Sequence, residues 1–567
     1  MGLILGMDTG GTFTDAVLFD QDSKKIIRKA KAPTTKEDLC IGLRESIAAL
    51  AYKDLSEVDL VCISTTLATN SVVEGKGCRV GLAVTGKMPS GVIPDAEIVT
   101  VGGSFDIRGR LHHELDENYV KAQIETLRTK VDAVAVSGYA CVRNPEHELT
   151  VKKIIREELQ VPVVCAHELT CELGYYERTV TAVLNAKLIP LIKRLIEDTR
   201  ICLHENGIDA PIMVVRGDGS YMDSEYAMER PVETILSGPA ASIKGAMFLS
   251  DLQDGTIIDV GGTTSDIAML RNGKVDLSME GAQVGGWRTR VKAVDVFTCG
   301  LGGDSRITVD QNGEIHIGPD KVIPASYAAS KKLSKTINTE CLTEQDREYR
   351  NLFGMSNGYN DIGFTPTDMA HILGLYNAWD RKAAERYLHD LAQRMNISGE
   401  ILMDRLLQEF REAILNALRN SAKLVSNCPI VALGAPSEAW MPLVLKDSEY
   451  QLVVPEHSEV ANAVGAAIGE IEEVVEILIR QDELTGNYIG YSKWQRKEFT
   501  DLENAKTECM EDAKTHAIEQ AQKCGCDAPE LMCDLHDVYL NTYDGKRKDY
   551  IETVISVVAV GAPTFLK

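Results

Sequence analysis

No long hydrophobic run is present in this sequence. A helix that crosses a bilayer needs about 20 mostly apolar residues in a row, and the 567 residues contain no such stretch. The apolar beginning, MGLILGMDTGG, is interrupted by Asp8 and has no basic segment before it, which predicts a buried strand and not a signal peptide. Gly6 stands where a myristoylation site needs Ser or Thr. We therefore expect no membrane attachment.

Basic residues are too few to balance the acidic ones. The chain has 60 Lys and Arg against 84 Asp and Glu, a formal net charge of -24. Such a surface repels nucleic acid and anionic membranes, so any bound ATP has to be held by local backbone amides and a metal ion. The 14 cysteines are spread singly along the chain, which favours reduced thiols and a cytoplasmic protein.

Strands and helices alternate through the first part of the chain. The stretches 132–138 and 161–165 have the character of strands, and 146–159 between them has that of an amphipathic helix. This alternation predicts an α/β layered fold. The helical pattern over 177–207, which ends at Gly207, predicts a long helix that connects two lobes.

The remainder of the chain predicts two further units. Residues from about 325 to 425 are mostly helical and polar, as expected for an insertion on the second lobe. The last unit combines a strand (487–494), a helix (502–525) and paired strands (535–560) that turn at Asp544-Gly545. This order predicts a small α+β domain.

Two glycine-rich turns with the same pattern lie far apart in the sequence. Residues 3–20 and 256–270 each combine an apolar strand, an Asp, Gly-Gly-Thr after one intervening residue, and a second strand with a further Asp. A glycine pair alone more often marks only a tight turn, but the repetition indicates duplicated lobes. Glycine lets backbone amides approach phosphate oxygens. Asp8 and Asp259 precede the turns, where a carboxylate can hold Mg²⁺ waters or polarise a nucleophile.

A third element, 431–444, is an apolar strand that ends in Gly434-Ala435-Pro436. On its own it is an ordinary strand–loop–helix junction. After two phosphate turns it becomes the expected adenosine site, because a loop of small residues leaves a flat backbone surface for the base.

The order of these elements resembles the superfamily of actin, sugar kinases and heat-shock chaperone ATPases. More narrowly, the chain is similar to the hydantoinase/oxoprolinase family, specifically its ATP-dependent hydantoinase A-type subunit, over roughly residues 3 to 470. The similar blocks are DTGGTFTDAV at 8–17, TTLATNSVVEGKG at 65–77, ERTVTAVLNAKL at 177–188, the segment 216–242, DVGGTTSDIAML at 259–270, GLGGDS at 300–305, TPTDMAHILGL at 365–375 and HSEVANAVGAA at 457–467.

The resemblance implies two duplicated actin-like (ribonuclease H-like) lobes around a nucleotide cleft. We expect an N-terminal lobe at 1–176 and a second lobe at 177–470, which includes the connecting helix and the helical insertion. A small α+β domain is expected at 471–567.

The resemblance also implies an activity. Family members use ATP to open cyclic amides such as hydantoins or 5-oxoproline, and some relatives carboxylate ketones. We expect a magnesium-dependent hydrolase that binds ATP and a cyclic amide, forms an oligomer and works with a separately encoded hydantoinase B-type subunit. Two alternatives stay open: a ketone- or acyl-activating carboxylase component, and a partner-dependent ATPase that remodels another enzyme.

Carried over residue by residue, the resemblance assigns a site in which Asp8 and Asp259 organise Mg²⁺ and the attacking group. The residues expected to contact the nucleotide are Thr9, Gly10, Gly11, Thr12, Gly261, Gly262, Thr263, Thr264, Gly302, Gly303, Asp304, Gly434 and Ala435.

Four further residues are candidates for substrate binding. Arg178, next to Glu177, could hold a substrate carboxylate through a bidentate contact, although an exposed ion pair at a helix start is an equal alternative. Thr66 and Asn70 could contact substrate or simply cap a helix.

The sequence departs from the family at two places. Members usually carry His-Gly before the threonines of the 65–77 block, where this chain has Ile63 and Ser64. A Gly-Gly-Gly-Ser block is replaced by 302–305, in which Asp304 adds a carboxylate beside the nucleotide. The missing histidine bears on the amide chemistry and not on ATP binding.

Cysteines and histidines near the end of the chain, Cys524, Cys526, Cys533 and His536, suggest a metal site at first sight. Cys-x-Cys is not the spacing common in structural zinc sites, so we expect buried thiols at a helix end. His112-His113 is expected in a solvated loop.

Overall fold

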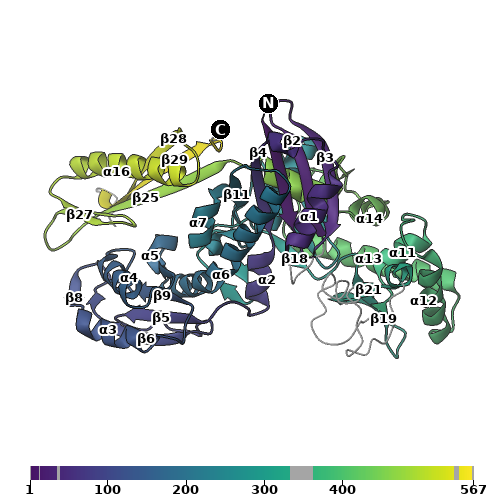
Figure 1. Ribbon diagram of the computed structural model, residues 1–567, viewed down its shortest axis with the longest axis horizontal. Coiled ribbons are helices and arrows are strands. Elements are labelled where there is room, and N and C mark those ends of the chain that lie inside the picture. The colour runs from purple at the N-terminus through teal and green to yellow at the C-terminus, as the bar shows by residue number, and fades with distance from the viewer. Residues whose placement is uncertain (1, 12, 35–38, 332–361, 542–547, 565–567) are drawn as a thin grey trace.

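The computed structural model describes residues 2–11, 13–34, 39–331, 362–541 and 548–564. Figure 1 shows the N-terminal strands at the top, an inserted domain with β5, β6 and β9 at the lower left, and the C-terminal domain above it. Helices α11, α12 and α13 lie at the right. None of the helices in the described ranges combines the length and apolar character that a membrane span requires.

The first lobe is built on a six-stranded sheet of order β12-β11-β4-β1-β2-β3. Strands β1, β2 and β3 are antiparallel, whereas β4 and β11 run parallel to β1. Strand β1 is buried at every position, as its continuous apolar run predicts. The strands are β1 (Leu3–Thr9), β2 (Phe13–Asp20), β3 (Lys25–Pro33), β4 (Val58–Thr65), β11 (Ile212–Val215) and β12 (Tyr221–Asp223).

The second lobe repeats this arrangement. Its strand order is β15-β14-β13-β23-β24, with β13, β14 and β15 antiparallel and β23 and β24 parallel to β13. The duplication expected from the two glycine-rich turns is therefore present in strand order and direction. These strands are β13 (Gly255–Val260), β14 (Ser265–Arg271), β15 (Lys274–Val275), β23 (Ile430–Leu433) and β24 (Leu452–Val453).

The sheets do not divide where the chain was expected to divide, between residues 176 and 177. Strands β11 and β12 complete the first sheet, and both follow the long helix α6 (Tyr175–Glu205). A parallel neighbour needs a crossover connection. Between β4 and β11 that crossover contains α6 and an entire inserted domain, which the sequence did not reveal as separate.

The inserted domain has a parallel sheet of order β10-β9-β5-β6. Helices α3 and α4 pack on one face, and Ala182, Val183 and Ala186 of α6 pack on the other. Other residues of α6, such as Leu184 and Leu188, belong to the core of the first lobe. The domain comprises β5 (Val80–Thr85), β6 (Glu97–Gly102), β7 (Ser104–Phe105), β8 (Leu111–His113), α3 (Glu117–Glu125), β9 (Ala133–Gly138), α4 (Glu146–Glu158), β10 (Val163–Cys165) and α5 (Ala166–Leu169).

The insertion in the second lobe is helical in its described part, as expected. Side chains of Asp380 and Ser398 accept hydrogen bonds from the first turns of α12 and α13, which is why these helices begin there. Residues 332–361 lie outside the described ranges. The helices are α9 (Ala325–Ser330), α11 (Pro366–Ile372), α12 (Arg381–Arg394) and α13 (Gly399–Asn420).

The C-terminal domain has an antiparallel sheet of order β27-β26-β25-β29-β28 covered by α16 (Leu502–Lys523). Small buried residues recur every four positions along α16 and let it lie close to the sheet; they are Ala505, Cys509, Ala513, Ala517 and Ala521. The strands are β25 (Ile471–Gln481), β26 (Tyr488–Tyr491), β27 (Arg496–Phe499), β28 (Glu530–Asn541) and β29 (Lys548–Gly561). The predicted Asp544-Gly545 turn lies outside the described residues.

The shorter elements complete the described fold. They are α1 (Leu39–Ala49), α2 (Leu67–Val73), α7 (Ser224–Glu229), α8 (Ser237–Ser250), β16 (Gln283–Val284), β17 (Trp287–Arg288), β18 (Phe297–Cys299), β19 (Ser305–Val309), β20 (Ile315–Lys321), β21 (Ile323–Pro324), β22 (Ile362–Gly363), α14 (Ser437–Val444) and α15 (Ala461–Ala467).

Cysteines at the end of α16 are buried thiols, as predicted. Cys524 and Cys526 are free and buried, whereas Cys533 is free and exposed on β28. Among the described residues these side chains form no group with metal-ligand spacing. His112 and His113 are exposed, although they lie in the short strand β8 and not in a loop.

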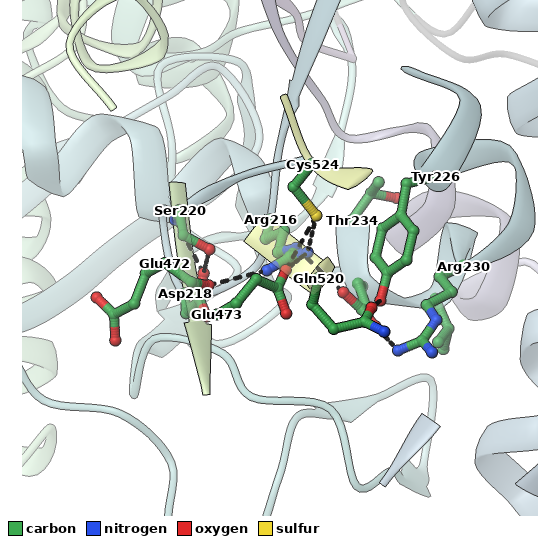
Figure 2. A network of polar contacts seen from close by, with 12 residues as sticks. Arg216, Asp218, Ser220, Tyr226, Arg230, Thr234, Glu472, Glu473, Gln520 and Cys524 are labelled. Carbon is green, nitrogen blue, oxygen red and sulfur yellow. Dashed lines mark hydrogen bonds and ion pairs between the residues drawn. The ribbon is translucent and has the colours of Figure 1, made fainter. Parts of the chain in front are cut away.

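A buried arginine fastens the C-terminal domain to the first lobe (Figure 2). Arg216 forms ion pairs with Glu233 (3.1 Å) and with Glu473 of β25, and its guanidinium also lies 3.3 Å from the Cys524 sulfur. The Arg216 side chain is 8% exposed. Two carboxylates thus compensate a charge that would otherwise be costly to bury.

We predict that Arg216→Lys loosens this contact without unfolding the lobes. Lysine keeps the charge but cannot serve several partners from one planar group, so the free energy of unfolding should fall by about 1–2 kcal/mol. Hydrogen exchange should rise in β25 and α16 and stay unchanged in β13. Arg480→Lys, which alters an ion pair within the C-terminal sheet, is the control. Equal exchange in both variants would contradict the assignment of Arg216 as the fastening residue.

Candidate functional site

Helices α8 and α15 cross between the two sheets in backbone contact. A β-carbon at Gly465 would lie 1.8 Å from the Ala241 carbonyl oxygen, and one at Gly245 would lie 2.0 Å from that of Ala461. Only glycine fits such an approach. Because α15 also packs on β1 and α8 on β13, this crossing fixes how the glycine-rich turns of the two lobes face each other.

The first turn carries Asp8 at the end of β1. Its carboxylate is 3% exposed and accepts hydrogen bonds from Ser64 Oγ (2.5 Å) and Asn462 Nδ2 (3.2 Å). Burial raises the pKa of Asp8 to about 7, against the lowering effect of the Ser64 hydrogen bond. The backbone of Gly10 and Gly11 beside it is partly exposed.

The second turn carries Asp259, which is partly buried at the equivalent position on β13. Ser242 Oγ lies 2.6 Å from Asp259 Oδ2 and 2.7 Å from Asn462 Oδ1. Burial raises the pKa of Asp259. Asp8, Asn462, Ser242 and Asp259 therefore form one continuous chain of polar contacts that joins the two turns.

Each turn has a second aspartate opposite the first. Asp15 pairs in register with Asp8 on β1 and β2, and Asp266 pairs with Asp259 on β13 and β14. Asp15 forms an ion pair with Lys31 (3.0 Å). Burial raises the pKa of Asp266 to about 6. The sequence pattern contained both residues, but their position across the strands follows only from the register.

The loops expected at the nucleoside converge on the second turn. Backbone N–H groups of Gly303 and Asp304 donate to Gly261 (3.0 Å) and Gly262 (2.7 Å). A β-carbon at Gly262 would lie 2.6 Å from Asp304 Oδ2. Burial raises the pKa of Asp304 to about 6, against the lowering effect of Lys321.

Gly434 closes the same region from the third element. It has a φ of +88°, and a β-carbon there would lie 2.2 Å from the Val260 carbonyl oxygen and 2.9 Å from Asp259 Oδ1. Ala435 beside it is exposed, and its carbonyl accepts a hydrogen bond from Tyr376. The position therefore requires glycine and leaves backbone at the edge of the turn.

The threonines of the two turns have different surroundings. The Thr9 hydroxyl donates to the Ser64 carbonyl and is buried, so it is occupied within the protein. Thr263 is exposed and Thr264 partly exposed. Thr12 lies outside the described residues.

The substrate candidates separate into two places. Thr66 donates through its backbone to Thr9 (3.2 Å), and Asn70 donates to the Thr66 hydroxyl, so both lie beside the first turn. Thr66 precedes α2 without forming a side-chain cap. Arg178 is 1% exposed and donates to the carbonyls of Glu172 (3.1 Å) and Tyr139 (2.9 Å).

The burial of Arg178 excludes an exposed ion pair at the helix start, and its contact with a substrate stays a prediction. Its Nη1 and Nη2 donate to carbonyls at the junction of α6 and the inserted domain, whereas its buried Nε has no hydrogen-bond partner among the described residues. Glu177 is partly exposed in the first turn of the same helix. The inserted domain, which the sequence did not define, covers this helix start.

Three residues that contact Asp8 or Asp259 had no role assigned from the sequence. Ser64 was noted only as a departure from the family, yet its hydroxyl contacts Asp8 directly. Ser242 and Asn462 stand in the similar blocks 216–242 and 457–467. Their place in these blocks was the sequence signal that could have indicated a role. The contact between the two residues, however, depends on the crossing of α8 and α15.

Comparison with known proteins agrees with this architecture. The model of the hydantoinase/oxoprolinase N-terminal region matches residues 4–159, and the hydantoinase/oxoprolinase model matches residues 178–474. The caprolactamase subunit alpha of Pseudomonas jessenii is 30% identical over 350 residues, which are 56% of this chain and 50% of that protein. The acetophenone carboxylase gamma subunit of Aromatoleum aromaticum is 30% identical over 363 residues, 56% of this chain and 49% of that protein. The chain thus spans about half the length of these curated relatives.

Solved structures share the fold over the full chain. A nucleotide-free acetone carboxylase superposes with a TM-score of 0.71 at 17% identity, covering 99% of this chain and 88% of that one. The ATP-dependent caprolactamase of Pseudomonas jessenii superposes with a TM-score of 0.70 at 22% identity, covering 100% and 88%. With both family models matched in order along most of its length, the chain belongs to the hydantoinase/oxoprolinase family.

Proposed function

We propose that the protein is an actin-like ATPase that opens a cyclic amide by transferring the γ-phosphoryl group of ATP to the amide oxygen. The observation that carries this proposal is the polar chain from Asp8 through Asn462 and Ser242 to Asp259. It joins the glycine-rich turns of the two duplicated lobes. A site that binds the phosphates of ATP between two lobes requires such a connection, because both turns must be held in position around the phosphates. Among the relatives are a caprolactamase and a 5-oxoprolinase.

ATP would lie with its phosphates between the two turns and its nucleoside against the 302–304 and 434–435 backbone. The glycines at 262 and 434 support this placement, because β-carbons there would clash with Asp304 and with the Val260 carbonyl and would force these backbone segments apart. Asp8 and Asp259 supply the oxygen donors that suit Mg²⁺. When bound, the cation would neutralise phosphate charge.

The chemistry needs little covalent participation from the protein. The amide oxygen attacks the γ-phosphorus as the bond to ADP breaks, which leaves a carbon bonded to a phosphate ester oxygen. Water then adds to that carbon, and the C–N bond breaks as the nitrogen takes a proton, which leaves an acyl phosphate on the opened chain. A second water hydrolyses the acyl phosphate to the carboxylate and inorganic phosphate. Asp259 is the better candidate to accept the proton of the water, because it is more exposed than Asp8 and contacts a hydroxyl that can pass on a proton.

A ketone-activating carboxylase component is the second candidate. It is favoured by the 30% identity to an acetophenone carboxylase subunit, and phosphorylation of an enolate oxygen would use the same turns. For either reaction we propose a second, B-type subunit as partner, because the two first relatives are named as subunits.

The proposal is tested by ATP turnover with Mg²⁺ in three arms: a panel of lactams and hydantoins, a panel of ketones with bicarbonate, and neither. Lactam-stimulated turnover with release of the ring-opened amino acid supports the hydrolase. Turnover that needs ketone and bicarbonate assigns the carboxylase. If only a partner protein stimulates ATP turnover, both the hydrolase and the carboxylase proposals are contradicted, and a partner-remodelling ATPase is the remaining function.

Asp304 should weaken nucleotide binding when it is ionised. Its folded pKa of about 6 lies above the usual 3.8, so the carboxyl is neutral below pH 6 and charged above it. We therefore predict that Asp304→Asn binds ATP about fivefold more tightly than the parent at pH 7.5 and equally at pH 5. Calorimetric titrations at both pH values check this. Weaker binding by the variant at pH 7.5 would instead show that Asp304 assists the cation.

A further inference from the structure

The inserted sheet has a second potential binding place at the carboxyl ends of its strands. The four strands are parallel in the order β10-β9-β5-β6. The chain passes from β5 to β6 on one side and then returns to β9 and β10 on the other, so the direction of winding reverses between β5 and β9. In open α/β sheets, ligands bind in the crevice outside the strand ends at such a switch point.

A cavity of about 70 Å³ lies at this switch point. The strands β5, β6 and β9 that surround it are at the lower left of Figure 1. It is enclosed by Thr85–Lys87 after β5, by Ser104 and Phe105 after β6, and by Gly138–Cys141 after β9. The first turn of α4 closes it. A cavity needs about 10–15 Å³ to hold one water, so this one suits a group of about four non-hydrogen atoms.

Two buried polar side chains face this cavity without a protein partner. His147 is 6% exposed, stacks on Phe105 with 4.0 Å between ring centroids, and has no hydrogen bond to any described residue. Thr85 is 5% exposed, and its hydroxyl likewise bonds to none of the described residues. Buried polar groups are normally hydrogen-bonded, so two such groups in one cavity indicate bonds completed by a ligand.

The charges around the cavity favour a neutral ligand. Glu148 is 1% exposed and accepts hydrogen bonds from the backbone of Gly138 (2.6 Å) and His167 (3.1 Å). His167 Nδ1 also lies 2.5 Å from Glu148 Oε2, so the carboxylate already has its partners within the protein. Burial lowers the pKa of His147, which keeps the imidazole neutral. Lys87 also borders the cavity, but it is exposed to solvent. A charged ligand would therefore lose its hydration without gaining a buried counter-charge.

We propose that this crevice is a second small-molecule site, which binds a neutral carboxamide. The amide carbonyl accepts from the Thr85 hydroxyl, and the amide N–H donates to a nitrogen of the His147 ring. The methylene or methyl part lies against Phe105 and Ala140. The inference is independent of the proposed function, since it uses no residue of the glycine-rich turns.

Acetamide and acetate test this proposal, because they have the same number of non-hydrogen atoms and differ in charge. Ligand-observed NMR on the full chain without ATP should show saturable acetamide binding in the millimolar range, with acetate about tenfold weaker or more. Thr85→Val and His147→Phe, which keep shape and stacking, should each weaken acetamide about tenfold. His389→Phe, at an exposed position on α12, should leave it unchanged.

Two outcomes would overturn the proposal. One is acetate binding as tightly as acetamide, and the other is an unchanged acetamide affinity in Thr85→Val. Should His147→Phe fail to fold, as judged by circular dichroism, Thr85→Val decides alone. Acetamide binding should persist in an Asp8→Asn variant that has lost ATP turnover. The experiment therefore distinguishes an error in this proposal from an error in the proposed function.

Discussion

ATP turnover should fall about a thousandfold in Asp8→Asn. The substitution keeps the size of the side chain and its acceptor for Ser64, but removes the charge that faces the phosphates and breaks the donation from Asn462 (3.2 Å). Steady-state phosphate release under the conditions that activate the parent protein measures the effect. Asp20→Asn is the matched control, because Asp20 is equally buried at the far end of β2.

Loss of turnover in Asp8→Asn must be separated from loss of the fold. The folded pKa of Asp8, about 7, is above the usual 3.8, so this group favours folding below pH 4 and loses that contribution as pH rises through 7. Without ligands at pH 8, the variant should therefore resist urea at least as well as the parent, and the difference should vanish by pH 4. An inactive variant that also unfolds earlier at pH 8 would contradict the assigned role.

The second large effect is expected at the helix crossing. Gly465→Ala inserts a methyl group where the Ala241 carbonyl oxygen would be 1.8 Å away, so α8 and α15 must separate. We expect the free energy of unfolding to fall by about 3 kcal/mol and ATP to lose its ability to protect the crossing from hydrogen exchange. Urea denaturation and exchange with and without ATP measure the two effects.

Gly399→Ala is the control for this prediction. It also changes a helical glycine, but a β-carbon there meets its nearest neighbour, Leu388, at an ordinary 3.9 Å, so stability should stay the same or rise slightly. If Gly465→Ala behaved like Gly399→Ala, the close approach of the two helices would not be what sets the arrangement of the lobes.

The two turns could be predicted because their information is local. Asp8 and Asp259 each stand before a Gly-Gly pair, separated from it by one residue, in the same strand–turn–strand unit, and the repetition of the unit identified it. The partners of these aspartates could not be predicted in the same way. Asn462 reaches Asp8 only because α15 crosses α8 and packs on β1, and hydrophobic periodicity contains no information on which helix meets which sheet.

The inserted domain was the largest feature not anticipated. Two of its strands, β9 and β10, were recognised individually, but short buried strands look alike whether they join one sheet or another. Assigning them all to the first lobe also misplaced Arg178, whose burial depends on that domain covering the start of α6. The helical pattern of the sequence predicted that Arg178 lies near the start of the helix. The contacts of its side chain depend on tertiary packing, which the pattern does not contain.

The discontinuous first sheet affects how the protein is synthesised. Strand β1 is among the earliest segments to leave the ribosome. Its parallel neighbour β4 has no second partner until β11 is made, and α15, which packs on β1, follows hundreds of residues later. The inserted domain, whose strands are close in sequence, can fold first as the chain emerges. The apolar β1 must meanwhile stay shielded, so production of this protein should depend on chaperones that hold nascent chains until translation is complete.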